Sequence, residues 1–142
     1  MDLNRSGHHL AWFEDLAKER IITETVENTL YDDGSIIWDM LRTDLIHPIC
    51  SGNKFFKLKY YLLDAIQKKH TNIVTSGGAW SNHIVATALA ARACGLGSVG
   101  YIRGERSATP SETLREAGSL GMEFRFVNRA DYSKIPPVLP GE

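Results

Sequence analysis

The chain has 142 residues, 43% of them hydrophobic, and its 16 Lys and Arg nearly balance its 17 Asp and Glu, for a net charge of −1. A chain of this length forms one domain and buries roughly 68–70% of its unfolded surface without disulfides or metals. The scattered, balanced charge excludes the basic face of a nucleic-acid or membrane-surface binder. We therefore expect small-molecule partners, no nucleic acid and no membrane.

The cysteine and histidine patterns argue against a disulfide-linked protein and against a metalloprotein. Cys50 and Cys94 lie far apart without a Cys-x-x-Cys pair, which favours reduced thiols in a cytoplasmic protein. The five histidines have no metal-ligand spacing, so we expect no metal site. No apolar run approaches the about 18 residues that span a bilayer.

Before residue 50 the pattern predicts one helix and one strand. Apolar residues recur every three or four positions over 9–20, which is typical of an amphipathic helix. After a turn at 32–34, the β-branched and aromatic residues of 35–41 predict a strand, and Pro48 marks a loop.

From Lys54 onward, predicted helices and strands alternate. The helices are 54–69, 81–94 and 110–120, and the strands are 72–75, 98–102 and 123–127, with a Gly77-Gly78 turn after the first strand. This alternation predicts βαβ crossovers and a parallel sheet covered on both faces, a three-layer α/β unit. Ligands bind such sheets at the carboxyl ends of the strands, where residues 76–82 lie.

Lys54 is the candidate nucleophile. Covalent catalysis through a Schiff base needs a primary amine beside a group that fixes the substrate. Such an amine must lose its proton, and Lys57, one helical turn on, offers a neighbouring cation that favours the loss. The alternative is that both are ordinary solvated lysines of a helix surface.

The segment Ser81-Asn82-His83 is the candidate anion site. The free N–H groups of a helix start, a hydroxyl and an amide suit a carboxylate or a phosphate. His83 is either a hydrogen-bond donor to substrate or a plain helix residue. The alternative for Ser81 is an ordinary N-cap that satisfies its own helix.

Four ordered blocks resemble one family. They are Arg42-Thr43-Asp44-Leu45, Ser51-Gly52-Asn53-Lys54-Phe55-Phe56-Lys57-Leu58, Ser76-Gly77-Gly78-Ala79-Trp80-Ser81-Asn82-His83 and Gly100-Tyr101-Ile102-Arg103-Gly104-Glu105. Over residues 41–127 the chain resembles the N-terminal half of the 1-aminocyclopropane-1-carboxylate deaminase and D-cysteine desulfhydrase family. These are fold-type II pyridoxal-phosphate enzymes related to the tryptophan synthase β subunit.

The resemblance implies roles for five residues. Lys54 would be catalytic and would carry pyridoxal 5'-phosphate, with Asn82 and Lys57 also at the cofactor. Ser81, Asn82 and His83 would bind the substrate carboxylate, and His83 stands where deaminases have glutamine. The implied activity is a lyase or deaminase reaction that turns D-cysteine or 1-aminocyclopropane-1-carboxylate into a 2-oxo acid and ammonia. The Ser-Asn-His block favours the D-cysteine branch.

Family members are much longer than this chain, so we expect an N-terminal fragment that is inactive alone and forms a homodimer when full length. We expect residues 1–50 to pack on the absent larger domain, 51–130 to form the cofactor-lysine domain, and 131–142 to be a Pro-rich tail or truncated linker. Two alternatives stay open. One is a non-catalytic α/β domain that binds a nucleotide or small anion at the Ser81 helix start; the other is an inactive interaction or degradation product.

Overall fold

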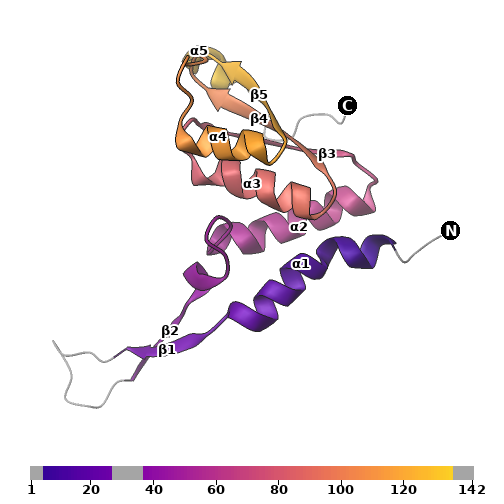
Figure 1. Ribbon diagram of the computed structural model, residues 1–142, viewed down its shortest axis with the longest axis vertical. Helices are drawn as coiled ribbons and strands as arrows, with labels where there is room; N and C mark the ends of the chain where they lie inside the picture. Colours follow the sequence, from indigo (N-terminus) through magenta and orange to yellow (C-terminus); the bar gives the residue numbers. More distant parts are fainter. Residues whose placement is uncertain (1–4, 27–36, 136–142) are drawn as a thin grey trace.

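The computed structural model describes residues 5–26 and 37–135 (Figure 1). Along the chain the elements are α1 (Arg5–Arg20), β1 (Thr23–Val26), β2 (Trp38–Leu41), the 3-10 helix η1 (Thr43–Leu45), α2 (Asn53–Gln67), β3 (Asn72–Gly78), α3 (Asn82–Ala93), β4 (Gly97–Arg103), α4 (Glu112–Ser119), β5 (Met122–Val127) and α5 (Arg129–Tyr132). All predicted helices and strands have a counterpart. The pattern missed β1, η1 and α5, and the turn at 32–34 and the tail from residue 136 lie outside the described residues.

The sheet confirms the α/β class. Its order is β3-β4-β5 and both pairings are parallel. The chain passes through α3 between β3 and β4 and through α4 between β4 and β5, as βαβ connections require. The predicted alternation and the parallel sheet are thus confirmed.

Helices α2, α3 and α4 lie on one side of the sheet. Ile73 packs into the core that α2 and α3 form, and Phe124 packs into the core beside α4. On the opposite face, the side chain of Val74 is 42% exposed. Figure 1 shows the sheet, then α3 and α4, and then α2 on the side of α3 that faces away from the sheet. None of α2, α3 and α4 covers the second face, in contrast to the coverage of both faces that the alternating pattern predicted. On that face Arg103 of β4 lies 5.6 Å from the ring centroid of Tyr132 in the one-turn helix α5.

Helix α3 is the centre of the packing, because it lies between the sheet and α2. Its inner positions are small or β-branched and buried all round, as in Ile84, Ala86, Ala88 and Ala90. Short alanine side chains let helix axes and strands approach closely, and a helix that is apolar on every side must be buried. The apolar stripe of α2 also lies in this core, with Phe55, Leu58, Leu62 and Ala65 buried.

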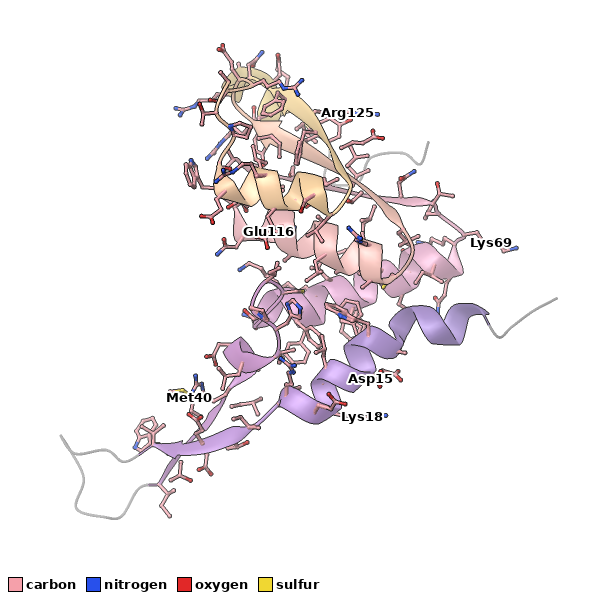
Figure 2. All side chains as sticks on the ribbon, viewed as in Figure 1. Asp15, Lys18, Met40, Lys69, Glu116 and Arg125 are labelled. Carbon is pink, nitrogen blue, oxygen red and sulfur yellow. The ribbon has the colours of Figure 1, made fainter. Side chains whose placement is uncertain are left out.

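The N-terminal segment has two parts: helix α1, which packs against α2, and the hairpin of β1 and β2. Phe13 of α1 is fully buried, with its ring centroid 5.0 Å from that of Phe55 in α2. Strands β1 and β2 pair antiparallel and project away from the helices, and Met40 on β2 is 52% exposed (Figure 2). The predicted division of the chain at residue 50 stays a prediction.

The base of the hairpin is held by Arg42. Its backbone N–H donates to the Ile22 carbonyl at 2.9 Å, and its guanidinium donates to Glu24 and to both carboxylate oxygens of Asp44. An isolated two-stranded hairpin is only marginally stable in water, so this bidentate pair ties it to η1. Arg42 and Asp44 belong to one of the blocks that carry the resemblance, and their structural task was not evident from spacing.

Candidate functional site

Lys54 lies in the first turn of α2. The helix begins after Gly52, whose φ of 59° and ψ of −144° are open to glycine and costly for other residues. The Gly52 N–H donates to the Thr43 carbonyl of η1 at 2.9 Å, and its own carbonyl accepts from Phe55. The glycine of the Ser-Gly-Asn-Lys block therefore sets the direction in which α2 leaves the loop, and with it the position of Lys54.

The start of α3 has an N-cap at Ser81. The Ser81 hydroxyl accepts a hydrogen bond from the His83 N–H at 3.3 Å, so it satisfies its own helix, as the N-cap alternative expected. Asn82 is exposed, while Ser81 and His83 are half-buried. The Asn82 amide therefore remains accessible to a ligand at this helix start.

The Gly77-Gly78 pair is not a turn, which corrects the prediction from sequence. Both residues continue β3 and pair with Ile102 and Arg103 of β4. A Cβ on Gly77 would lie 2.9 Å from Ile84 Cγ1 in α3, whereas a Cβ on Gly78 would meet only an arginine nitrogen at 4.0 Å. The first glycine is thus required for close packing of the strand against the helix, and the chain turns one residue later.

The two helix starts that bear the candidate residues are electrostatically coupled. Burial lowers the pKa of His83 below its usual 6.5, and the positive charges of Lys54 and Lys57 lower it further. The His83 ring is therefore neutral at neutral pH, with one donor and one acceptor nitrogen. Two ammonium groups and the N–H groups of α3 give this region a positive potential, which suits an anionic ligand.

Cys50 is a neighbour of Lys54 that the sequence did not assign to the site. Its side chain is fully buried, and burial raises the pKa of its thiol to about 11, while the Lys54 charge acts in the opposite direction. The thiol is protonated at neutral pH and is not a nucleophile in this state. Cys94 is also buried in the core, and burial raises the pKa of its thiol to about 11.

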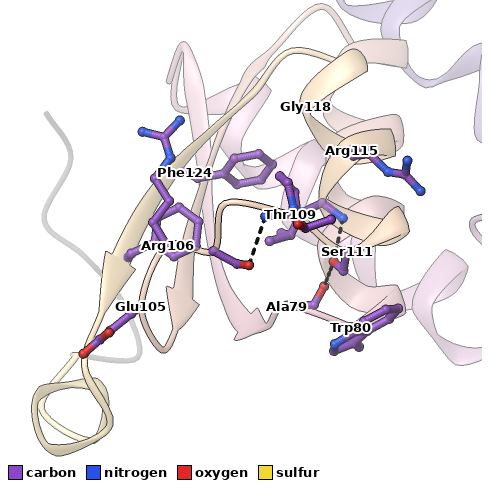
Figure 3. Close-up of a pocket in the computed structure, with 13 residues that line it drawn as sticks. Ala79, Trp80, Glu105, Arg106, Thr109, Ser111, Arg115, Gly118 and Phe124 are labelled. Carbon is purple, nitrogen blue, oxygen red and sulfur yellow. Dashed lines mark hydrogen bonds between the residues drawn. The ribbon is translucent and has the colours of Figure 1, made fainter.

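A cavity of about 460 Å³ lies beside Trp80 and α4 (Figure 3). Its apolar part comes from Leu114, Phe124 and Phe126, and Trp80, 76% exposed, stands at its edge. The Ser111 hydroxyl beside it donates to the Ala79 carbonyl and accepts from Leu114. The lining includes Trp80 but none of the five predicted site residues, so this is not a cavity shared by Lys54 and Asn82.

Two absences hold for residues 5–26 and 37–135. No group of three or more His, Cys, Asp and Glu in this part of the chain is arranged to hold a metal ion. Likewise, none of the helices described there is long and apolar enough to cross a bilayer.

Curated proteins of other organisms are similar to this chain in sequence. A protein of Thermotoga maritima provisionally named 1-aminocyclopropane-1-carboxylate deaminase is 36% identical over 97 residues, 68% of this chain and 31% of its own length. The Arabidopsis thaliana bifunctional D-cysteine desulfhydrase/1-aminocyclopropane-1-carboxylate deaminase is 27% identical over 108 residues, 72% of this chain and 27% of its own. The chain belongs to the family of 1-aminocyclopropane-1-carboxylate deaminases and D-cysteine desulfhydrases. No family model matches it.

A solved structure has a similar fold. The crystal structure of an ACC deaminase homologue superimposes with a TM-score of 0.62 and 26% identity, covering 84% of this chain and 38% of that one. The chain therefore spans only about a third of the length of the relatives it matches.

Proposed function

We propose that the complete gene product is a pyridoxal-phosphate enzyme that converts a small amino acid and water into a 2-oxo acid and ammonia. D-cysteine, which would also release sulfide, is the favoured substrate, and 1-aminocyclopropane-1-carboxylate is the second. The observation that supports this most is the packing of α2, whose first turn carries Lys54, against α3, whose first turn carries Asn82 and His83, in one buried core, in a chain of this family. The charges of Lys54 and Lys57, which add to the effect of burial on the pKa of His83, are consistent with a site between these helix starts.

The residues present fit one end of such a cofactor. Lys54 is half-buried at a helix start fixed by Gly52, so its amine is placed on a rigid element and remains reachable. Lys57 is exposed one turn further on, and Asn82 offers an exposed amide. We assign Lys54, Lys57 and Asn82 to the cofactor. Pyridoxal phosphate, when bound, supplies an electron sink for negative charge at the substrate α-carbon.

The chain's own groups would share the remaining work. Asn82 and the N–H groups of α3 bind the substrate carboxylate, with Ser81 and His83 beside them. His83, being neutral, contributes a hydrogen bond and no second charge. The Lys54 amine, when free, is the base that takes a proton from the substrate and returns it. Gly52 fixes the helix start that carries this amine.

The test is a set of lysine variants in the complete gene product. Lys54→Ala should abolish both the visible absorbance of lysine-bound cofactor and 2-oxo acid release. Lys57→Ala should only weaken them. Lys68→Ala is the matched control, because Lys68 sits at the far end of α2 in a surface ion pair with Asp64. Unchanged turnover in Lys54→Ala would refute the proposal. Phosphate binding unaffected by that change, without turnover of the unmodified protein, would favour the non-catalytic anion-binding domain.

Three further points belong to the proposal. Both cysteines are free and buried, which suits the reducing cytoplasm where we place the protein. A homodimer is the expected assembly of the complete gene product, and sedimentation would test it. Comparison of kcat/KM for D-cysteine and 1-aminocyclopropane-1-carboxylate would decide the substrate.

A further inference from the structure

His47 lies in the loop between η1 and α2, and its Nδ1 atom accepts two backbone hydrogen bonds. The donors are the N–H groups of Ile49, at 3.1 Å, and Cys50, at 3.3 Å. A ring nitrogen that accepts hydrogen bonds carries no proton, so the proton of the neutral imidazole is on Nε2. The bend of this loop therefore depends on one protonation state of one side chain.

The loop that His47 holds leads directly to Lys54. Cys50 is fully buried in the core between α1, α2 and α3, while its N–H is one of the two groups bound by His47. Only three residues separate Cys50 from Lys54, and the Lys54 charge acts on the Cys50 thiol. A shift of the loop would therefore be transmitted to the first turn of α2.

The surroundings of the ring favour its neutral form. Trp12 of α1 packs against it, with ring centroids 5.7 Å apart. Burial lowers the pKa of His47, and the charge of Arg20 at the end of α1 lowers it further. Among the described residues, no carboxylate counts among the groups that shift it. The acceptor at Nδ1 thus persists at neutral pH and is lost only in acid.

We propose that His47 is a positioning residue whose unprotonated Nδ1 holds the loop that presents Lys54, and that a proton on Nδ1 releases this loop. A protonated Nδ1 is a donor, so the Ile49 and Cys50 N–H groups would lose their acceptor. The role of Lys54 rests on the proposed function, but the loop and its dependence on pH do not.

The experiment measures amide protection in the 142-residue chain across pH. In the unmodified chain, the protection factors of Ile49 and Cys50 should fall about tenfold as His47 takes up its proton. His47→Asn places an amide oxygen near the position of Nδ1 and should keep the protection without pH dependence. His47→Ala should lose it at neutral pH. The control is His70→Ala, since His70 is exposed after α2, and it should change nothing.

A second measurement connects the loop to Lys54. Competitive acetylation should change the reactivity of Lys54 relative to Lys68 by about threefold or more in His47→Ala, but leave it unchanged in His47→Asn. Neither measurement needs the cofactor. A protein that passes both and fails to bind pyridoxal phosphate would refute only the proposed function.

Several results would overturn the inference. Nitrogen NMR that finds the proton on Nδ1 at neutral pH would do so, as would pH-independent protection of Ile49 and Cys50 in the unmodified chain. These two hold even where His47→Ala fails to fold. Equal Lys54 reactivity in His47→Ala, His47→Asn and the unmodified chain would show that the loop does not position the lysine.

Discussion

Gly77 and Gly78 differ in what an added methyl group would meet, and this difference predicts different stabilities. In Gly77→Ala the new Cβ would lie 2.9 Å and 3.0 Å from Cγ1 and Cδ1 of Ile84, and 3.2 Å from Cβ of Ser81. Carbon atoms pack best at about 3.5–4.0 Å. Ile84 is fully buried and has little room to move, so overpacking should cost about 1–3 kcal/mol.

Urea unfolding measures this cost. With a slope of about 2 kcal/mol/M, Gly77→Ala should lower the unfolding midpoint by about 0.5–1.5 M without changing the slope. Gly78→Ala is the matched control, because its Cβ would meet only an Arg103 nitrogen at 4.0 Å, and its midpoint should stay within about 0.3 M. In an Ile84→Val background, which lacks Cδ1, Gly77→Ala should cost less. Equal midpoints for Gly77→Ala and Gly78→Ala would refute the steric argument.

Three more predictions concern the site and its surroundings. Gly52→Ala should destabilise the chain by about 1–3 kcal/mol through backbone strain alone, as measured by urea titration, and should also alter the reactivity of Lys54. Gly104→Ala is the control, since Gly104 also has a positive φ and open space around it, and it should show only the loss of stability. The pKa of His83 is lowered in the folded state, so the unfolded chain takes up the proton first as pH falls. The free energy of unfolding should therefore fall as pH drops below about 6.5. His83→Gln should make the free energy of unfolding depend less on pH in this range. The folded pKa values of Cys50 and Cys94 are raised to about 11 from 9.0, so their stabilising effect should be complete below pH 9 and lost as pH rises toward 11; fast reaction with a thiol reagent at pH 8 without denaturant would contradict their burial.

Much of the fold could be predicted because local patterns decide it. The helix that follows Gly52, the alternation from Lys54 onward and the helix start at Ser81 each depend on neighbours within one or two turns, and all three are confirmed. Lys54 and the Ser81 block were also found from sequence, because an amine and a helix start are recognisable as residue types. Their roles stay predictions.

Tertiary contacts decided the rest. The sequence could not distinguish a Gly-Gly turn from a strand that continues, because the deciding atom is Ile84, in the next helix. It predicted helices on both faces of the sheet, but the side on which a helix packs depends on contacts between elements far apart, and α2, α3 and α4 share one side. His47 had no metal spacing and therefore no predicted role. Its two hydrogen bonds exist only where the loop bends back on the ring, beside Cys50 in the buried core.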